Sequence, residues 1–270
     1  MSSLSLTEQE LSGARVIVTG AAGSIGSELV RQVAAHGPEC IVLYDQAETD
    51  LYHLELELRD EHPDLEIVPT VADILDSNAL DRVFRKYRPS RVFHAAAYKH
   101  VPLMQSNPRE AVRNNVIGTM RVADAAGRFG AGKFVLISTD KAVRPTSVMG
   151  ATKRVAELVT LRSQQRFPST WYVAVRFGNV LGSQGSVIPL FQKQLEDGKP
   201  LTVTHAEVER FFMTIPEATQ LVLQSSLLPE AKGMIVMLEM GEPVRILDLA
   251  RKLIRLAGRK EGVDTEVEFI

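Results

Sequence analysis

The chain has 270 residues, 45% of them hydrophobic and 24% charged, with a formal net charge of −2, which is typical of a globular protein. This charge gives no reason to expect nucleic-acid or membrane binding, and no apolar run or signal-peptide core indicates membrane insertion or export. A single cysteine, Cys40, excludes an internal disulfide and the histidines lack metal-binding spacing, so we expect a cytoplasmic protein without a metal ion.

Short apolar runs rich in β-branched residues alternate with amphipathic stretches of helical length. The expected strands are residues 15–20, 40–45, 66–73, 91–97, 133–139 and 171–180. The expected helices are residues 24–35, 48–59, 79–87, 108–128 and 148–166. This alternation predicts an α/β fold of Rossmann type, with a doubly wound parallel sheet covered by helices on both faces.

The alternation weakens after Arg176, where the remaining strand and helix candidates suggest a smaller mixed region. We therefore expect a cofactor-binding Rossmann domain formed by residues 1–178 plus about 213–240. The smaller substrate-binding region would comprise about 179–212 plus 241–270.

Three glycines follow the first expected strand in the stretch VTGAAGSIGSEL. Gly20 permits a tight turn, Gly23 lets backbone approach a pyrophosphate, and Gly26 lets the helix pack closely on the strand. The first helical amides, those of Ser24 and Ile25 among them, would face the pyrophosphate. The pattern predicts a dinucleotide site, and the alternative is a glycine-rich turn without a ligand.

Two acidic residues follow the next strands. Asp45 comes about 25 residues after the first glycine, where a carboxylate can accept hydrogen bonds from both adenosine ribose hydroxyls. Because the same carboxylate repels a 2′-phosphate, the sequence favours NAD over NADP. The alternative for Asp45 is an N-cap of the following helix. Asp73 is a candidate contact for the adenine amino group.

Longer strings extend the argument beyond single motifs. The strings AAYKHVPLM, STDKAV and RFFMTIPEA resemble extended short-chain dehydrogenase/reductases, in particular the polysaccharide-biosynthesis group of UDP-N-acetylglucosamine 4,6-dehydratases. The resemblance covers the chain from about Gly13 to Ile270. It implies NAD as cofactor, a UDP-N-acetylhexosamine as substrate, a role in polysaccharide or glycan biosynthesis, and a homo-oligomer.

The chain departs from this group in three places. Relatives usually continue beyond the last residues here with a GLRPGEKL-like segment, and many carry a membrane-spanning N-terminal region. We therefore expect the substrate region to be truncated at the C-terminus, and the chain to be either the soluble part of a membrane-anchored protein or a natural short form. Glu209 stands beside Arg210, where relatives more often have a neutral residue, and this acid would weaken substrate binding.

The segment STDKAVRPTSVMGATKR raises the main chemical question. Most members of the resembling family carry a tyrosine four residues before the lysine that matches Lys153, but here that position is Met149. A thioether neither gives nor takes a proton. Methionine is a known variant in the group, whose working residues match Thr139, Asp140 and Lys141.

The resemblance assigns oxidation at carbon 4, loss of water across carbons 5 and 6, and hydride return to carbon 6. Thr139 would hydrogen-bond the 4-hydroxyl, Asp140 would protonate the departing 6-hydroxyl, and Lys141 would remove the proton on carbon 5. The alternative for the Asp-Lys pair is a surface salt bridge or turn. Lys153 would hold the nicotinamide ribose, and its alternative is an exposed helix lysine.

Further residues take supporting roles by position or resemblance. Small side chains that would let the cofactor lie against the fourth strand are Ala95, Ala96 and Ala97. Candidates for substrate contact are Lys99, His100, Asn179, Ser186 and Arg210, of which the last three would bind the uracil and diphosphate. His100 could equally be a loop histidine, and Asn115 is expected to brace the active-site backbone.

Three functions remain open at this point. The leading hypothesis is an NAD-dependent 4,6-dehydratase, because the Asp140-Lys141 pair supplies an acid that epimerisation does not need. The first alternative is a nucleotide-sugar 4-epimerase with the same binding parts. The second is a cofactor-binding module without catalysis, which the absence of the tyrosine allows.

Overall fold

The structure is a computed structural model that describes residues 7, 9–183 and 185–269. It contains two compact units. The first comprises Met1–Phe177 and Thr219–Leu238, and the second comprises Gly178–Ala218 and Glu239–Ile270. None of the helices in the described ranges is long and apolar enough to cross a membrane.

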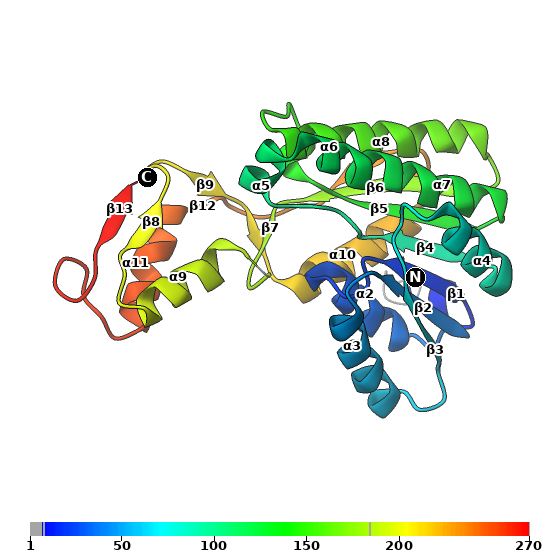
Figure 1. The fold of residues 1–270 in the computed structure, drawn as a ribbon, viewed down its shortest axis with the longest axis horizontal. Helices are drawn as coiled ribbons and strands as arrows, with labels where there is room; N and C mark the ends of the chain where they lie inside the picture. Colours follow the sequence, from blue (N-terminus) through cyan, green and yellow to red (C-terminus); the bar gives the residue numbers. More distant parts are fainter. Residues whose placement is uncertain (1–6, 8, 184, 270) are drawn as a thin grey trace. The chain divides into compact units, whose positions relative to one another are not determined.

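The first unit is built on a seven-stranded sheet in the order β11-β6-β5-β4-β1-β2-β3, with every neighbouring pair parallel (Figure 1). The strands are β1 (Arg15–Thr19), β2 (Cys40–Asp45), β3 (Glu66–Val71), β4 (Arg91–His94), β5 (Lys133–Thr139), β6 (Trp171–Phe177) and β11 (Ile235–Met237). The predicted doubly wound parallel sheet is thereby confirmed. The strand order reverses between β1 and β4, and in such sheets ligands bind beyond the carboxyl ends at this point.

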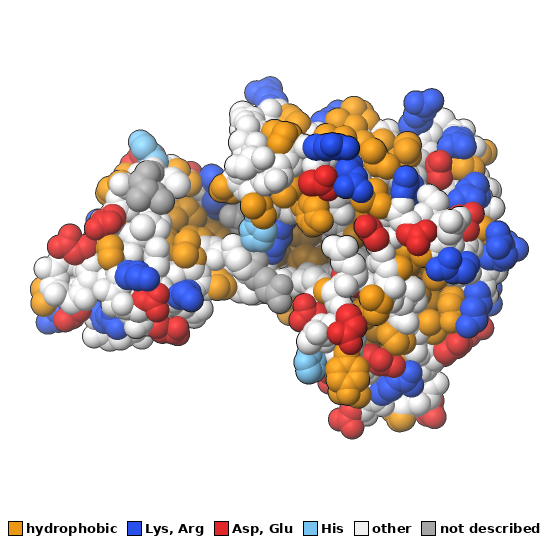
Figure 2. All heavy atoms as spheres, viewed as in Figure 1, with side chains coloured by type: hydrophobic (Ala, Val, Ile, Leu, Met, Phe, Trp, Pro, Cys, Tyr) orange, Lys and Arg blue, Asp and Glu red, His pale blue; other side chains and the backbone are white. Residues whose placement is uncertain are grey.

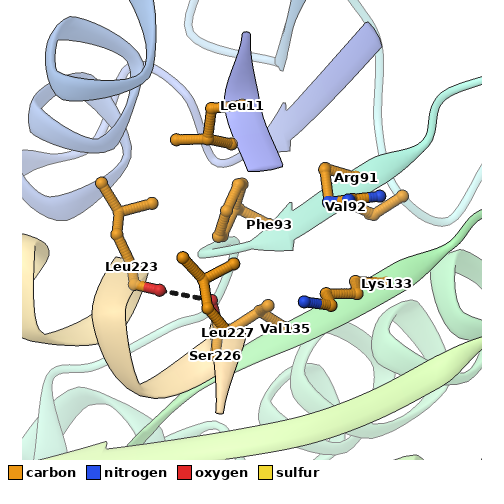
Figure 3. Close-up of a pocket in the computed structure, with 9 residues that line it drawn as sticks. All are labelled: Leu11, Arg91, Val92, Phe93, Lys133, Val135, Leu223, Ser226 and Leu227. Carbon is orange, nitrogen blue, oxygen red and sulfur yellow. Dashed lines mark hydrogen bonds between the residues drawn. The ribbon is translucent and has the colours of Figure 1, made fainter. Parts of the chain in front are cut away.

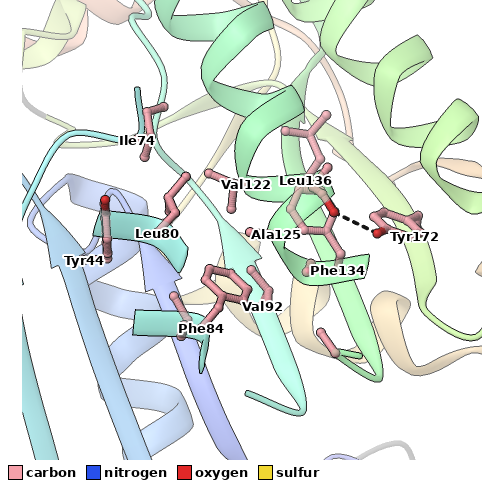
Figure 4. Packing of buried hydrophobic residues seen from close by; sticks show 14 of the residues in the cluster. Tyr44, Ile74, Leu80, Phe84, Val92, Val122, Ala125, Phe134, Leu136 and Tyr172 are labelled. Carbon is pink, nitrogen blue, oxygen red and sulfur yellow. Dashed lines mark hydrogen bonds between the residues drawn. The ribbon is translucent and has the colours of Figure 1, made fainter. Parts of the chain in front are cut away.

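Helices cover both faces of this sheet. The main ones are α2 (Ser24–Ala34), α3 (Glu48–Glu61), α4 (Ser77–Tyr87), α7 (Thr119–Arg128), α8 (Val148–Arg166) and α10 (Ile215–Leu227). One large buried cluster joins alternate residues of the strands to α4, α7 and α8, and includes Phe84, Phe134 and Tyr172 (Figure 4). The buried Tyr172 hydroxyl donates a hydrogen bond to the Ala123 carbonyl at 2.8 Å, so it is not left unpaired in the core. This core fixes the strand ends that carry the candidate residues.

The expected helix at 108–128 differs from the observed one. It consists of α6 (Pro108–Ala111), a π-helix η1 (Val112–Gly118) and α7, and α5 (Val101–Ser106) precedes it. A π-turn takes in one extra residue and is frequent at functional sites. Here it brings the buried Asn115 side chain to the loop that follows β4, where Tyr98 N donates to Asn115 Oδ1 at 2.8 Å.

The second unit has its own small core. Its elements are β7 (Asn179–Val180), α9 (Val187–Glu196), β8 (Leu201–Val203), β9 (Glu209–Arg210), β10 (Phe212–Met213), β12 (Val244–Arg245), α11 (Ile246–Leu256) and β13 (Val267–Phe269). Phe191 and Leu195 of α9 pack against Leu201 of β8 and Ile254 of α11. The expected strand at 171–180 is interrupted at Gly178, so its end pairs with β10 in this unit and not with the large sheet.

Lys and Arg side chains gather over α4 and the end of α7 (Figure 2). The guanidinium carbons of Arg85, Arg88 and Arg128 lie 5.8, 5.7 and 5.3 Å from the centre of the Phe129 ring. Two of these arginines stand in the last turn of their helices, where a cation is favoured by the helix dipole. The basic residues therefore form a solvated face stabilised by local contacts.

Candidate active site

The glycine loop joins β1 to α2 at the carboxyl end of the sheet. Gly20 has a φ of 72°, and a Cβ on it would lie 2.5 Å from Ala96 N, so only glycine fits between the loop and the end of β4. A Cβ on Gly26 would overlap the Gly20 carbonyl oxygen. Gly23 is different, because its Cβ would meet only Gly20 O, at 3.4 Å, and would otherwise face open space.

Open space over Gly23, next to the first turn of α2, is what a pyrophosphate cradle requires. Ser24 and Ile25 occupy that first turn, with their backbone amides at the helix N-terminus. The residues present therefore fit a dinucleotide.

Asp45 lies at the end of β2 and connects this strand to the glycine loop. Its Oδ2 accepts a hydrogen bond from Ala22 N at 3.0 Å, and its Oδ1 accepts one from Ala47 N at 3.0 Å. Helix α3 begins after Ala47 without a side-chain cap, so the N-cap alternative for Asp45 is wrong. Asp73 lies two residues beyond β3, where its Oδ1 accepts from Leu75 N at 2.8 Å. Contact of either residue with an adenosine stays a prediction.

The segment after β4 carries the small and polar candidates. Ala95, Ala96 and Ala97 continue from the strand, and Ala95 N donates to Thr19 O at 2.9 Å. Lys99 and His100 are exposed in the loop before α5. Asn115 Nδ2 donates to Tyr98 O at 3.0 Å and to Thr152 Oγ1 at 3.1 Å, so the asparagine braces this loop against α8 as expected.

Thr139, Asp140 and Lys141 form one hydrogen-bonded cluster at the carboxyl end of β5. The Thr139 hydroxyl donates to Asp140 Oδ1 at 2.9 Å, and Lys141 Nζ donates to the same oxygen at 3.1 Å. The Thr139 oxygen also caps the short turn Asp140–Ala142 by accepting from Lys141 N at 3.3 Å. The side chains of Asp140 and Lys141 are 22% and 31% exposed, so a substrate can reach them.

Met149 occupies the position of the missing tyrosine and lies in an apolar cluster. It is 4% exposed and packs with Met104 and Ala111, with Val101 and Val148 beside it. A thioether in an apolar cluster fills space and adapts to irregular gaps. Met149 is therefore a packing residue.

Lys153 is buried, so the alternative of an exposed helix lysine is wrong. Its Nζ donates to the Ile137 carbonyl at 2.6 Å, which ties α8 to the end of β5. Burial lowers the pKa of Lys153 to about 8, although the Glu157 carboxylate opposes the shift. The lysine therefore titrates close to physiological pH. Its contact with a ribose stays a prediction.

The remaining three candidates belong to the second unit. Asn179 lies in β7, and its backbone N–H donates to Phe211 O at 3.0 Å. Ser186 stands at the N-terminus of α9, and its Oγ is buried with no hydrogen-bond partner in the described part of the chain. Arg210 is exposed in β9, while the neighbouring Glu209 lies 3.5 Å from Arg245. A cation thus already neutralises this acid, which reduces its expected effect on an anionic substrate.

A small pocket lies elsewhere in the first unit and does not overlap this site. It is lined by Leu11, Arg91, Val92, Phe93, Lys133, Val135, Leu223, Ser226 and Leu227 (Figure 3). Arg91 and Lys133 are the first residues of β4 and β5, so the pocket is at the amino ends of the strands. The candidate residues of the first unit, such as Thr139 and Asp140, lie at or after the carboxyl ends of the strands, where ligands of such sheets bind.

A family model described as "Polysaccharide biosynthesis protein" matches residues 16–270. The chain belongs to this family. The expected resemblance to the polysaccharide-biosynthesis group is thereby confirmed.

The sequence relatives of this chain are named for more than one activity. The chain is 51% identical over 267 residues to "Capsular polysaccharide biosynthesis protein CapD" of Staphylococcus aureus, covering 98% of this chain and 44% of that protein. It is 30% identical to "UDP-N-acetylglucosamine 4,6-dehydratase (inverting)" of Campylobacter jejuni, covering 88% and 70%. It is 32% identical to a Rickettsia rickettsii "UDP-glucose 4-epimerase", covering 77% and 61%. The chain thus spans less than half the length of the staphylococcal relative.

Solved structures show the same fold. The structure named Pen, from Bacillus thuringiensis, matches with a TM-score of 0.88 and 31% identity, covering 96% of this chain and 80% of that chain. A dTDP-glucose 4,6-dehydratase of Streptomyces venezuelae, solved with NAD and TYD bound, matches with a TM-score of 0.81 and 25% identity, covering 95% and 84%. These neighbours agree with the assignment to extended short-chain dehydrogenase/reductases.

His94 is a buried polar residue at the carboxyl end of β4 that the sequence interpretation missed. It ends β4 with no exposed surface, 2.6 Å from Thr19 Oγ1 and 2.9 Å from Thr119 Oγ1. Thr119 donates its only hydroxyl proton to the Asn115 carbonyl at 2.7 Å, so it must accept from His94 Nε2–H. His94 Nδ1 then accepts from Thr19. A neutral imidazole therefore links the end of β1 to the first residue of α7.

This network makes stability depend on pH. Burial, aided by repulsion from Lys153, lowers the pKa of His94 to about 3. In the unfolded chain the pKa returns to about 6.5, so the unfolded state binds the extra proton as pH falls from 6.5 towards 3. We expect the free energy of unfolding to fall in this window by up to about 1.4 kcal/mol per pH unit from His94 alone.

Urea unfolding at several pH values below about 6.5 checks this expectation. His94→Gln, which can both donate and accept, should show a shallower loss of stability with falling pH than the unmutated chain. His53→Gln removes an exposed histidine and serves as the control. Equal slopes for His94→Gln and the unmutated chain would contradict the neutral assignment.

Proposed function

We propose that this chain dehydrates a UDP-N-acetylhexosamine, with UDP-N-acetylglucosamine as the expected substrate, to a 4-keto-6-deoxy sugar nucleotide in an NAD-dependent reaction. The observation that carries the proposal is the hydrogen-bonded Thr139–Asp140–Lys141 cluster at a strand end, together with a packed thioether at Met149. The Campylobacter jejuni relative named as a 4,6-dehydratase supports the substrate and the reaction. Membership of the polysaccharide biosynthesis family supports a role in surface polysaccharide or glycan synthesis.

The cofactor assignment uses the glycine loop and Asp45. Gly20, Gly23 and Gly26 with the first turn of α2 would hold the pyrophosphate, and Asp45 would hold the adenosine ribose. When bound, NAD supplies the means to oxidise carbon 4 and later to reduce carbon 6. Lys153, whose pKa lies near 8, would contact the nicotinamide ribose.

The cluster after β5 carries the proton transfers. Thr139 hydrogen-bonds the sugar 4-hydroxyl and passes its proton on to solvent as carbon 4 is oxidised. The 4-ketone acidifies the proton on carbon 5, so Lys141 needs to be only a modest base. Asp140 protonates the 6-hydroxyl as it leaves as water. One acid and one base, side by side, thus serve a single elimination.

This assignment requires a neutral lysine and a protonated aspartic acid, while the structure shows an ion pair at 3.1 Å. The two forms hold the same number of protons and differ only in the position of one. Excluding water on substrate binding penalises the ionic form by several kcal/mol per ion, which the attraction between the charges opposes. Because the two forms differ only in the position of one proton within the pair, Asp140 and Lys141 act together as one acid-base system.

A nucleotide-sugar 4-epimerase is the second candidate, and the Rickettsia relative named as a UDP-glucose 4-epimerase favours it. The two reactions share the oxidation of carbon 4, and they differ in whether water leaves. The two reactions are distinguished by incubating the protein with NAD and UDP-N-acetylglucosamine and measuring the product mass by mass spectrometry. A dehydratase yields a product lighter by one water. An unchanged mass with an inverted sugar would identify the epimerase, and an unchanged sugar would identify a binding module.

Cofactor selectivity gives an independent test of Asp45. We expect NAD to bind more tightly than NADP, because the carboxylate repels the 2′-phosphate. Asp45→Asn keeps the size of the side chain and removes its charge, so the preference for NAD should shrink about tenfold. Calorimetric affinities for both dinucleotides measure this, with Asp73→Asn as the control. Equal affinities for NAD and NADP in the unmutated chain would refute the assignment.

A further inference from the structure

Glu157 is a charged residue that the proposed chemistry leaves unused, and it has no exposed surface. It stands on α8, one turn after Lys153. Arg176 of β6 donates to both carboxylate oxygens at 2.6 Å, through Nε to Oε1 and through Nη2 to Oε2. Arg154 adds a bond of 3.1 Å to Oε2. The carboxylate is therefore fixed by two guanidinium groups, one of them bidentate.

The remaining contact of this carboxylate points to the strand that carries the site. The Ser138 hydroxyl donates to Glu157 Oε1 at 2.6 Å. Burial alone would raise the pKa of Glu157, but hydrogen bonds from Arg176, Ser138 and Arg154 outweigh it and hold that pKa below its usual value. The group remains an anion, so the bond that it accepts from Ser138 is charge-assisted.

Two more positions on the same face of α8 touch the end of β5 or the turn after it. Lys153 Nζ donates to the Ile137 carbonyl at 2.6 Å. A Cβ on Gly150 would overlap the Lys141 carbonyl oxygen, so glycine lets α8 approach the turn that carries the candidate base. Positions spaced by three and four residues lie on one helix face. Helix α8 thus contacts the segment immediately before, and within, the proposed proton-transfer cluster.

We propose that Glu157 is a positioning residue. Its carboxylate, fixed by Arg176, holds the end of β5 through the Ser138 hydroxyl and thereby sets where the Thr139–Lys141 segment stands. The effect on catalysis rests on the proposed function, whereas the anchoring itself does not. Small displacements of reacting groups are costly, since about 1 Å of misplacement lowers a rate by about 100-fold.

Ser138→Ala is the sharpest test, because it removes the link to β5 and leaves the Glu157–Arg176 pair in place. Ser163→Ala is the matched control. Ser163 lies within α8, is about as buried as Ser138, and donates to the Val159 carbonyl at 3.0 Å, within its own helix. Both variants therefore lose one buried hydroxyl, but only one of them loses contact with the site strand.

Hydrogen exchange measures the anchoring without any assumption about the reaction. The probes are the amides of Lys141 and Val143, which donate to Thr139 Oγ1 at 3.3 Å and to Asp140 O at 2.9 Å. We expect Ser138→Ala to speed exchange at both by about tenfold or more, and Ser163→Ala to leave it unchanged. The kcat for loss of water should fall by about 10- to 100-fold with KM for the sugar nucleotide within about twofold.

Unchanged exchange at these two amides in Ser138→Ala would overturn the proposal. Faster exchange in Ser138→Ala, together with an unmutated chain that forms no dehydrated sugar, would uphold the anchoring and refute the proposed function instead. Glu157→Gln provides a second variant, expected to speed exchange at the same amides because a neutral amide accepts a weaker bond. If it fails to fold, Ser138→Ala alone decides.

Discussion

Asp140→Asn should oxidise the sugar and then stop. The amide keeps the shape of the carboxyl group but has no carboxylic-acid proton to give to the departing 6-hydroxyl. Loss of a general acid costs about 100- to 10,000-fold in the step that it serves. Oxidation at carbon 4 needs no such acid. Mixing the variant with NAD and UDP-N-acetylglucosamine should therefore build up reduced-cofactor absorbance with little dehydrated sugar.

Asp81→Asn is the matched control, because Asp81 is also a partly exposed acid in an ion pair, with Arg128, but lies on α4. It should dehydrate the sugar at the normal rate. If Asp140→Asn also does so, Asp140 is not the acid. If Asp140→Asn gives no reduced cofactor, Asp140 takes part in the oxidation as well, and the proposed division of roles with Lys141 is wrong.

Two glycines of the cofactor loop should fail in different ways when replaced by alanine. In Gly26→Ala the new methyl overlaps the Gly20 carbonyl oxygen, a backbone atom that cannot move aside, so we expect the free energy of unfolding to fall by several kcal/mol. In Gly23→Ala the methyl meets only Gly20 O at 3.4 Å and otherwise projects into the space where a pyrophosphate would lie. This variant should fold normally and lose affinity for NAD by about 100-fold or more.

Urea unfolding and calorimetry, run on both variants, separate the two effects. Gly13→Ala controls for a methyl in open space at another loop, although its φ of 66° adds local strain. A Gly23→Ala protein that binds NAD as tightly as the unmutated chain would show that the pyrophosphate does not rest on this loop.

Much of the first unit could be predicted because its signals are local. The expected helix at 148–166 coincides with α8, and the expected strand at 133–139 coincides with β5. Both follow from hydrophobic periodicity bounded by turn residues. The glycine positions around the β1–α2 turn were predicted from a local motif, and for Gly26 the constraint is local, because its Cβ would overlap the Gly20 carbonyl oxygen. The constraint on Gly20 comes instead from Ala96, on the segment after β4.

What the sequence missed depends on contacts between distant residues. The π-helix η1 has an ordinary helical composition, and its extra residue is accommodated where Asn115 reaches the Tyr98 backbone and where Gly118 leaves room for Ile74. His94 bonds partners 75 and 25 residues away, so nothing local marks it. A histidine ending an apolar strand just before three alanines was the available signal.

The same limit applied to side-chain environments near the site. Lys153 could be taken as buried or exposed from its helical spacing, and only the packing of α8 on β5 shows that it is buried. The sequence did not indicate a role for Glu157, because its partners Ser138 on β5 and Arg176 on β6 are each 19 residues away from it. Ion pairs of this kind are set by the fold.

The path of one hydrogen atom tests the proposed reaction most directly. UDP-N-acetylglucosamine carrying deuterium at carbon 4 is incubated with the protein and NAD, and the product is examined by mass spectrometry and NMR. The proposed mechanism predicts a sugar that has lost one water and carries the deuterium at carbon 6. A product of unchanged composition with deuterium still at carbon 4, whether inverted or not, would contradict it.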